Sequence, residues 1–402
     1  MPGRHWLRNA VSITLMQFLV PSDASRPVAI IPMSPAPAPT NAVLGARSPG
    51  SSKVIAWLLL CCALVMAIVV VGGVTRLTHS GLSIVEWQPI VGTLPPIGEA
   101  QWLETFEKYK LTPEYHKVNQ GMSLDAFKGI FWWEYFHRLL GRIIGAVFLL
   151  PMLWFSWRGQ IDRPLALRLV GIFVLGGLQG AMGWYMVKSG LVDDPRVSQY
   201  RLTAHLSIAL AIYAITLWTA LGLLYRDRAA ASPPGLRRFA WIITALVAYM
   251  AVTGGFVAGI RAGAAYNTFP LMNGHLVPPE IFMLDPWYLN FFNNMATVQF
   301  AHRLGAWLLA LLVPWFWLQA RGEALTARAR HAIWLLLGML ALQIALGIAT
   351  LLLHVPVWLA AAHQGGAVVL LSAALLVNHA LRSPPAPARA RGQIQGMTST
   401  YS

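Results

Sequence analysis

The chain has 402 residues, of which 56% are apolar and only 11% are charged. A soluble domain needs roughly 25% charged residues to cover its surface, so this composition indicates a protein that lies largely within a lipid bilayer. The formal net charge of +15 does not indicate nucleic-acid binding, because the sequence has no basic stripe with interleaved aromatic residues and no nucleic-acid-binding motif.

Apolar runs of about 20 residues predict eight transmembrane helices. We expect them near residues 54–74, 135–157, 166–187, 202–224, 238–260, 298–319, 332–353 and 357–379. Cys61 and Cys62 are adjacent inside the first run, which favours two small core residues over a disulfide or a metal site. Residues 1–52 and 381–402 are rich in Pro and Ala, and we expect both to be disordered tails.

The distribution of Lys and Arg predicts the orientation of the chain in the membrane. Most of them fall in the two terminal segments and in the short loops 158–168, 225–238 and 320–331. The opposite side, mainly loop 75–134, holds more acidic than basic residues. Both termini are therefore predicted to be cytoplasmic (or to face the matrix), with the long loops on the outer side.

The two halves of the sequence repeat each other. The matched segments, in chain order, are Val70–Val74 with Val252–Phe256, Tyr135–Leu139 with Phe300–Leu304, Leu178–Gly183 with Leu342–Gly347, and Thr203–His205 with Ala361–His363. Each half has four spans, an even number, so both halves share one orientation and the pseudo-twofold axis runs along the membrane normal. The predicted fold is an all-α integral membrane protein of two tandem four-helix bundles, residues 53–225 and 226–380.

Four of the eleven histidines occupy matched positions near the start of even-numbered spans: His137, His205, His302 and His363. They are expected at one depth in the outer leaflet, with one pair in each bundle. Polar groups in hydrocarbon are costly and usually functional, and neutral imidazole is a common ligand of haem iron. No ring of carboxylates or cysteines accompanies them, which disfavours zinc or a di-iron centre. The pattern therefore predicts two haem sites, whereas the other seven histidines are expected to be solvated or interfacial.

One carboxylate distinguishes the two predicted sites. Glu134 precedes His137 by three residues and shares its helical face, whereas the matched position in the second half is Gln299. A carboxylate can move protons and an amide cannot, which favours the first bundle as catalytic and the second as a cofactor or electron-transfer site. The alternative is that Glu134 only pairs with Arg138 one helical turn later.

Arg138 and Arg303 directly follow the helix histidines. Two readings are open for them: contacts with haem propionates, since Arg binds carboxylates in a fork geometry, or extension to the outer membrane interface.

The segment Gly72–Pro89, followed by Pro95-Pro96, resembles the first-loop signature of haem A synthases, and Glu134–Arg138 resembles their second-helix motif. The resemblance covers roughly residues 54–380. It implies oxidation of a methyl substituent of haem O to a formyl group, which gives haem A for terminal oxidases such as cytochrome c oxidase. It also implies a haem B cofactor on His302 and His363, the substrate haem on His137 and His205, and Glu134 as the acid/base group.

Loop 75–134 has no cysteine, which places the chain nearer the cysteine-free branch of this family that proteobacteria and mitochondria share. We expect a bacterial inner membrane location, with the mitochondrial inner membrane as the alternative. Beyond haem O and membrane lipid, a haem O synthase and an electron-transfer partner are expected as partners. The main alternative function is a di-haem, quinol-linked electron-transfer cytochrome without substrate chemistry. The electron acceptor, the oxygen source and any homo-oligomer are left open.

Overall fold

The computed structural model describes residues 49–86, 91–191, 195–225 and 232–382. Most of the predicted disordered N-terminal tail and nearly all of the predicted disordered C-terminal tail lie outside these residues. Residues 49–52, which were assigned to the tail, belong instead to the first helix.

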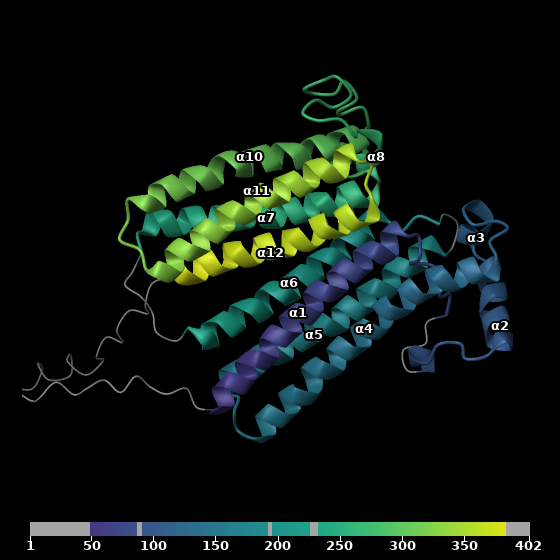
Figure 1. Cartoon of the computed structure of the whole chain (residues 1–402), viewed down its shortest axis with the longest axis horizontal. Helices are drawn as coiled ribbons and strands as arrows, with labels where there is room; N and C mark the ends of the chain where they lie inside the picture. The colour runs from purple at the N-terminus through teal and green to yellow at the C-terminus, as the bar shows by residue number, and fades with distance from the viewer. Residues whose placement is uncertain (1–48, 87–90, 192–194, 226–231, 383–402) are drawn as a thin grey trace, which may run out of the picture. The chain divides into compact units, whose positions relative to one another are not determined.

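Eight long helices run roughly side by side (Figure 1). They are α1 (Pro49–Leu77), α4 (Leu124–Trp157), α5 (Arg163–Gly190), α6 (Gln199–Leu224), α7 (Pro234–Gly259), α10 (Met295–Arg321), α11 (Ala327–Leu352) and α12 (Val357–Leu381). All eight are long and apolar enough to cross a membrane. The eight predicted spans are confirmed as helices, with ends that differ by a few residues except at α4.

The ends of several spans follow from local sequence. The side chains of Ser123, Asp162, Asn294 and Thr326 cap α4, α5, α10 and α11 by accepting backbone N–H groups of the first turn. Each cap satisfies a donor that the first helical turn leaves without an intrahelical partner. These four polar residues therefore define where α4, α5, α10 and α11 begin.

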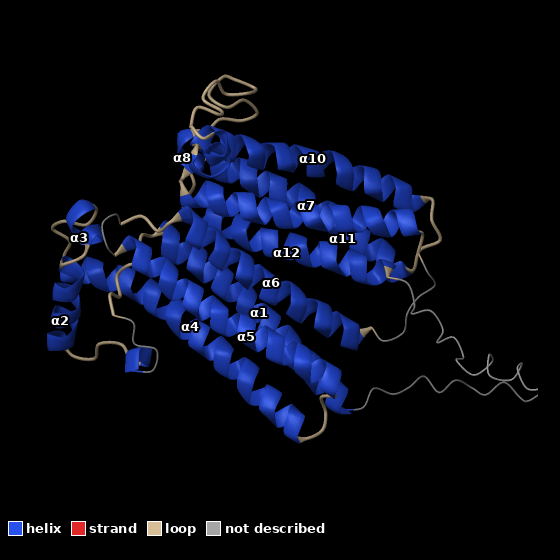
Figure 2. Ribbon diagram, turned by 180° about the vertical axis from the view of Figure 1, so that it is seen from behind, coloured by secondary structure: helices blue, strands red, loops and turns tan. Residues whose placement is uncertain are grey.

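The long helices pack against neighbours within and between the two halves of the chain. In the first half, α1 and α5 each pack against α4 and α6; in the second half, α7 and α11 each pack against α10 and α12. Both halves contain buried apolar side chains, such as Leu58 and Leu169 in the first half and Ile243 and Phe316 in the second. The halves meet where α6 packs on α7 and α12, and where α1 packs on α12 (Figures 1 and 2).

Two glycines let helices of different halves approach each other. Gly255 of α7 faces α6, where an added Cβ would lie 2.8 Å from Oγ1 of Thr203. Gly73 of α1 faces the side chain of Gln364 on α12, whose Nε2 donates to the carbonyl of Val69 at 2.7 Å. Because small residues permit close helix contacts in membranes, a larger side chain at either glycine would push the halves apart.

The segment between the first two spans is more ordered than predicted. It contains η1 (Val91–Thr93), α2 (Glu99–Lys110) and α3 (Pro113–Lys117), and α4 starts at Leu124 rather than near residue 135. These helices pack on the start of α4 through a buried aromatic cluster: Trp102, Phe106, Tyr109, Phe127, Phe131 and Tyr135. Charged residues interrupt the apolar ones in this segment. It therefore has no long apolar run from which a helix could be predicted.

The second long connection, between α7 and α10, contains α8 (Ala262–Ala265), η2 (Trp287–Leu289) and α9 (Asn290–Asn293). It emerges at the same end of the long helices as α2 and α3 (Figure 1). We call this end the long-loop face; the four matched histidines lie toward it.

Candidate active site

Each of the four matched histidines faces a glycine on a neighbouring helix of its own half. An added Cβ would lie 2.9 Å from Nε2 of His137 at Gly72, 3.0 Å from Cε1 of His205 at Gly183, 3.3 Å from Cε1 of His302 at Gly254, and 2.9 Å from Cε1 of His363 at Gly347. Gly72 corresponds to Gly254 in the repeat, and Gly183 corresponds to Gly347. The sequence repeat is therefore also a repeat of the histidine environments.

The histidines are also paired by half. His137 and His205 are close enough to interact electrostatically, and so are His302 and His363. In each pair, the two imidazoles come from helices of the same half: α4 and α6 for the first pair, and α10 and α12 for the second.

The imidazole nitrogens keep much of their bonding capacity. Nδ1 of His205 and Nδ1 of His363 are buried without a hydrogen-bond partner, and the ring of His137 has none among the described residues. The ring of His302 has one partner, since its Nδ1 lies 2.9 Å from Oγ1 of Thr253. Pairs of neutral imidazoles with glycine beside them suit the iron and the flat ring of a haem.

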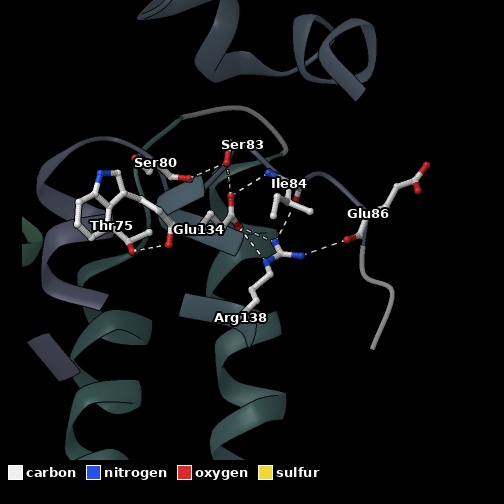
Figure 3. A network of polar contacts seen from close by, with 8 residues as sticks. Thr75, Ser80, Ser83, Ile84, Glu86, Glu134 and Arg138 are labelled. Carbon is white, nitrogen blue, oxygen red and sulfur yellow. Dashed lines mark hydrogen bonds and ion pairs between the residues drawn. The ribbon is translucent and has the colours of Figure 1, made fainter. Parts of the chain in front are cut away.

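Glu134 lies at the centre of a polar network beside the first pair (Figure 3). Its side chain is buried, with the residue only 2% exposed. Oε2 accepts hydrogen bonds from the Ser83 hydroxyl and the Ile84 backbone N–H, both at 2.8 Å. Oε1 accepts from Nη2 of Arg138 at 2.6 Å and from its Nε at 3.1 Å. Four donors thus converge on this carboxylate.

Arg138 links this carboxylate to the first loop. Its Nη2 also donates to the Ile84 carbonyl at 2.7 Å, and its Nη1 donates to the Glu86 carbonyl at 3.1 Å. The ion pair with Glu134 one turn earlier, left open by the sequence, is therefore present. The two residues together hold residues 83–86 against α4.

Arg303 holds the second long loop in a comparable way. Its Nη2 donates to the Tyr266 carbonyl at 2.9 Å, and its Nη1 donates to the Leu271 carbonyl at 3.2 Å. The nearby Gln299 is only 4% exposed, and its Oε1 has no hydrogen-bond partner among the residues that the structure describes. The second half thus repeats the arginine anchor but lacks the carboxylate.

The comparisons with known proteins give one consistent family. The family described as cytochrome oxidase assembly protein matches residues 55–375. A haem A synthase of Nitrosospira multiformis is 66% identical over 329 residues, which cover 81% of this chain and 92% of the relative. Haem A synthases of Nitrosomonas eutropha and Rhodospirillum centenum are 60% and 51% identical, over 80% and 86% of this chain and 91% and 92% of the relatives.

The chain belongs to the haem A synthase family. Its activity is the conversion of haem O to haem A, an oxidation. This bears out the resemblance seen in the sequence and favours an enzyme over an electron-transfer cytochrome. A haem A synthase must bind haem, and the unpartnered imidazole nitrogens and the glycines facing them fit that requirement.

A second buried carboxyl, which sequence reasoning missed, belongs to Glu114 of α3. It is 3% exposed and accepts a 3.4 Å hydrogen bond from the Tyr109 hydroxyl. Burial, with the nearby negative charge of Glu134, raises the pKa of Glu114 to about 8. No signal in a single sequence separates Glu114 from the exposed acidic residues Glu99, Glu104 and Glu107 of α2.

Glu114 lines a cavity of about 340 Å³ on the long-loop face. The other lining residues are His79, Lys117, Val118, Pro195, Arg196 and Arg261. Nη2 of Arg261 lies 3.2 Å from Nδ1 of His79, and burial together with Arg261 and Arg76 lowers the pKa of His79. His79 therefore lines this cavity while remaining partly exposed to solvent.

Two further predictions concern residues away from the site. His379 was expected to be solvated or interfacial, but it is fully buried, with its ring 5.2 Å from that of Trp218 and 6.0 Å from that of Tyr225. That expectation was wrong because the end of α12 lies against other helices rather than in solvent. Cys61 and Cys62 are buried and unbridged, as predicted.

Proposed function

We propose that the first half is the catalytic half of this haem A synthase and that the second half holds a haem B cofactor. The observation that carries this proposal is the carboxylate: two matched histidine pairs share one scaffold, but only the first has Glu134 beside it. Gln299 in the second half presents an amide, which cannot take up a proton at neutral pH.

The proposed architecture is two tandem four-helix bundles, residues 53–225 and 226–380, related by a pseudo-twofold axis along the membrane normal. The helix contacts support it, since α1 meets α12 and α7 meets α6. Gly73 and Gly255, which correspond in the repeat, serve these two contacts. A twofold axis that superimposes α1 on α7 and α6 on α12 would also superimpose the α1–α12 contact on the α7–α6 contact.

His137 and His205 would hold the iron of haem O, the substrate, and His302 and His363 would hold the iron of haem B. When bound, haem B supplies one-electron transfer. Each imidazole comes from a different transmembrane helix, so the helix packing sets the separation and orientation of the two ligands in each pair.

Glu134 is the proposed catalytic group. Conversion of a methyl to a formyl group breaks two C–H bonds, so protons must leave the reacting carbon. Glu134 lies three residues before His137 on the same helical face, and its charge is fixed by Arg138, Ser83 and Ile84. An anion held there favours positive charge on a methyl group losing electrons and can accept a proton from it.

Propionate contacts are proposed for Arg138 and Arg303. Both arginines hold a loop over a histidine pair, so both lie at the end of a site that faces the long loops. The buried Nε of Arg303 has no hydrogen-bond partner in the described part of the chain, and this donor suits a carboxylate.

The proposed location is a bacterial inner membrane with both termini cytoplasmic; the mitochondrial inner membrane remains the alternative. The proteobacterial relatives support the bacterial choice. A haem O synthase that supplies the substrate and a partner that removes electrons are the proposed partners.

Histidine variants test the assignment of the two sites. We expect His137→Ala to retain haem B and to produce no haem A, whereas His302→Ala should lose haem B. His275→Ala, in an exposed loop position, is the control and should behave as wild type. Extraction of haems from the purified proteins, with chromatographic identification, gives the readout. Haem A at the wild-type level in His137→Ala would overturn the assignment.

A further inference from the structure

Thr253 of α7 contacts one of the proposed haem ligands. Its Oγ1 lies 2.9 Å from Nδ1 of His302. The same hydroxyl lies 3.1 Å from the backbone carbonyl of Met250, one turn earlier on α7, and donates to it. Thr253 precedes Gly254, the glycine that faces the ring of His302.

The two hydroxyl contacts bear on where the imidazole proton lies. A threonine hydroxyl has one hydrogen and two lone pairs, and a carbonyl oxygen can only accept. With its hydrogen directed to Met250, the Thr253 oxygen accepts from the ring, so Nδ1 of His302 carries the proton. Nε2 then has a free lone pair, which is what a haem iron requires.

The first half lacks this hydrogen bond. Gly72 faces His137 as Gly254 faces His302, so the preceding residues, Val71 and Thr253, occupy equivalent positions. Valine has no hydroxyl, and the ring of His137 has no hydrogen-bond partner among the described residues. Among the four histidines, His302 is therefore the one whose ring has a hydroxyl partner in the described part of the chain.

We propose that Thr253 is a positioning residue: it orients His302 toward the haem iron through Nε2 and lowers the reduction potential of the second haem site. The inference rests on the proposed function, in which His302 would hold the iron of haem B. A hydrogen bond from Nδ1–H to an acceptor increases the basicity of the ligating nitrogen and fixes the ring orientation. A more basic ligand stabilises the oxidised iron, which lowers the potential.

The test measures the potential of haem B in the purified holoenzyme by optical redox titration. In Thr253→Val, which reproduces the residue of the first half, we expect haem B to remain bound with a potential shifted upward from wild type. Thr253→Ser keeps a hydroxyl and should restore the wild-type potential. Thr219→Val removes another buried hydroxyl, one that bonds only within α6, and should leave the potential unchanged.

An unchanged potential in Thr253→Val with haem B bound would overturn the proposal. If haem B is lost from Thr253→Val but retained in Thr253→Ser, the hydroxyl contact is supported; loss from both variants would contradict it. The companion variant His302→Ala separates this proposal from the one it rests on. Retention of haem B in His302→Ala would refute the ligand assignment itself, whereas its loss together with an unchanged Thr253→Val potential would refute only the role of Thr253.

Discussion

At the scale of single residues, the two halves share a frame and differ in a few polar side chains. The frame is the set of four histidines, each facing a glycine on an adjacent helix. Two matched positions beside the histidines differ between the halves. The first half has Glu134 where the second has Gln299, and it has Val71 where the second has Thr253. Because these residues stand on equivalent turns of equivalent helices, their chemistry rather than their placement separates the two sites.

The glycines that face the histidines give a prediction at this scale. In Gly183→Ala the new methyl group would lie 3.0 Å from Cε1 of His205, so the ring must move away from its position. We expect loss of haem from the first site and at least a tenfold fall in haem A formation, with haem B retained. Gly176→Ala, on the same helix with open space around the new atom, is the matched control. Extracted haems provide the measurement, and equal haem A yields from the two variants would contradict the account.

At the scale of elements, the sequence predicted the spans well and the long loops poorly. An apolar run of about 20 residues is a local feature, so all eight spans were visible in the sequence. Helices α2 and α3 were missed because buried Trp102, Phe106 and Tyr109 alternate with charged residues, and their burial depends on packing against α4.

The candidate site was predictable to the extent that its residues repeat or are close in sequence. The histidines and the contrast of Glu134 with Gln299 follow from the repeat, and the Glu134–Arg138 pair from helical spacing. The other partners of Glu134 do not, because Ser83 and Ile84 are 51 and 50 residues away along the chain. Only the folded loop brings them to the carboxylate.

The position of α3 gives a pH prediction at the element scale. Burial and Glu134 raise the pKa of Glu114 from 4.5 to about 8, so between these pH values the folded state binds more protons than the unfolded state. The contribution of Glu114 to stability therefore falls as pH rises through this window. The groups around it are Tyr109, Glu134 and Arg261 with the cavity residues His79, Lys117 and Arg196.

Glu114→Gln removes this titration. We expect its melting temperature, relative to wild type, to increase from about pH 5 to about pH 8. Glu107→Gln is the control, since Glu107 is an exposed residue paired with Lys110. Its melting temperature relative to wild type should be the same at both pH values. Thermal unfolding of the detergent-solubilised protein measures this, and a pH-independent difference for Glu114→Gln would show that Glu114 has an ordinary pKa.

At the scale of the whole molecule, eight spans place both ends of the described chain on the same side of the membrane. If that side is the cytoplasm, as proposed from the distribution of Lys and Arg, the long-loop face and both histidine pairs lie near the outer surface. Protons released at Glu134 would then leave toward the outer side, through the face where Glu114 and its cavity lie.

Thiol labelling of intact cells tests this orientation. The native Cys61 and Cys62 are buried, so they give little background with a membrane-impermeant reagent. We expect Glu104→Cys, on α2, to be labelled in intact cells. Glu323→Cys, in the loop between α10 and α11, should be labelled only after permeabilisation. The reverse pattern would place the active site at the cytoplasmic surface.

The central claim is that Glu134 makes the first half catalytic, and the haems extracted from membranes containing wild type or Glu134→Gln test it most directly. The variant reproduces the residue of the second half and keeps the size of the side chain. The account predicts haem A in the wild type, and in the variant haem B with unconverted haem O and no haem A. Haem A at the wild-type level in Glu134→Gln would contradict it.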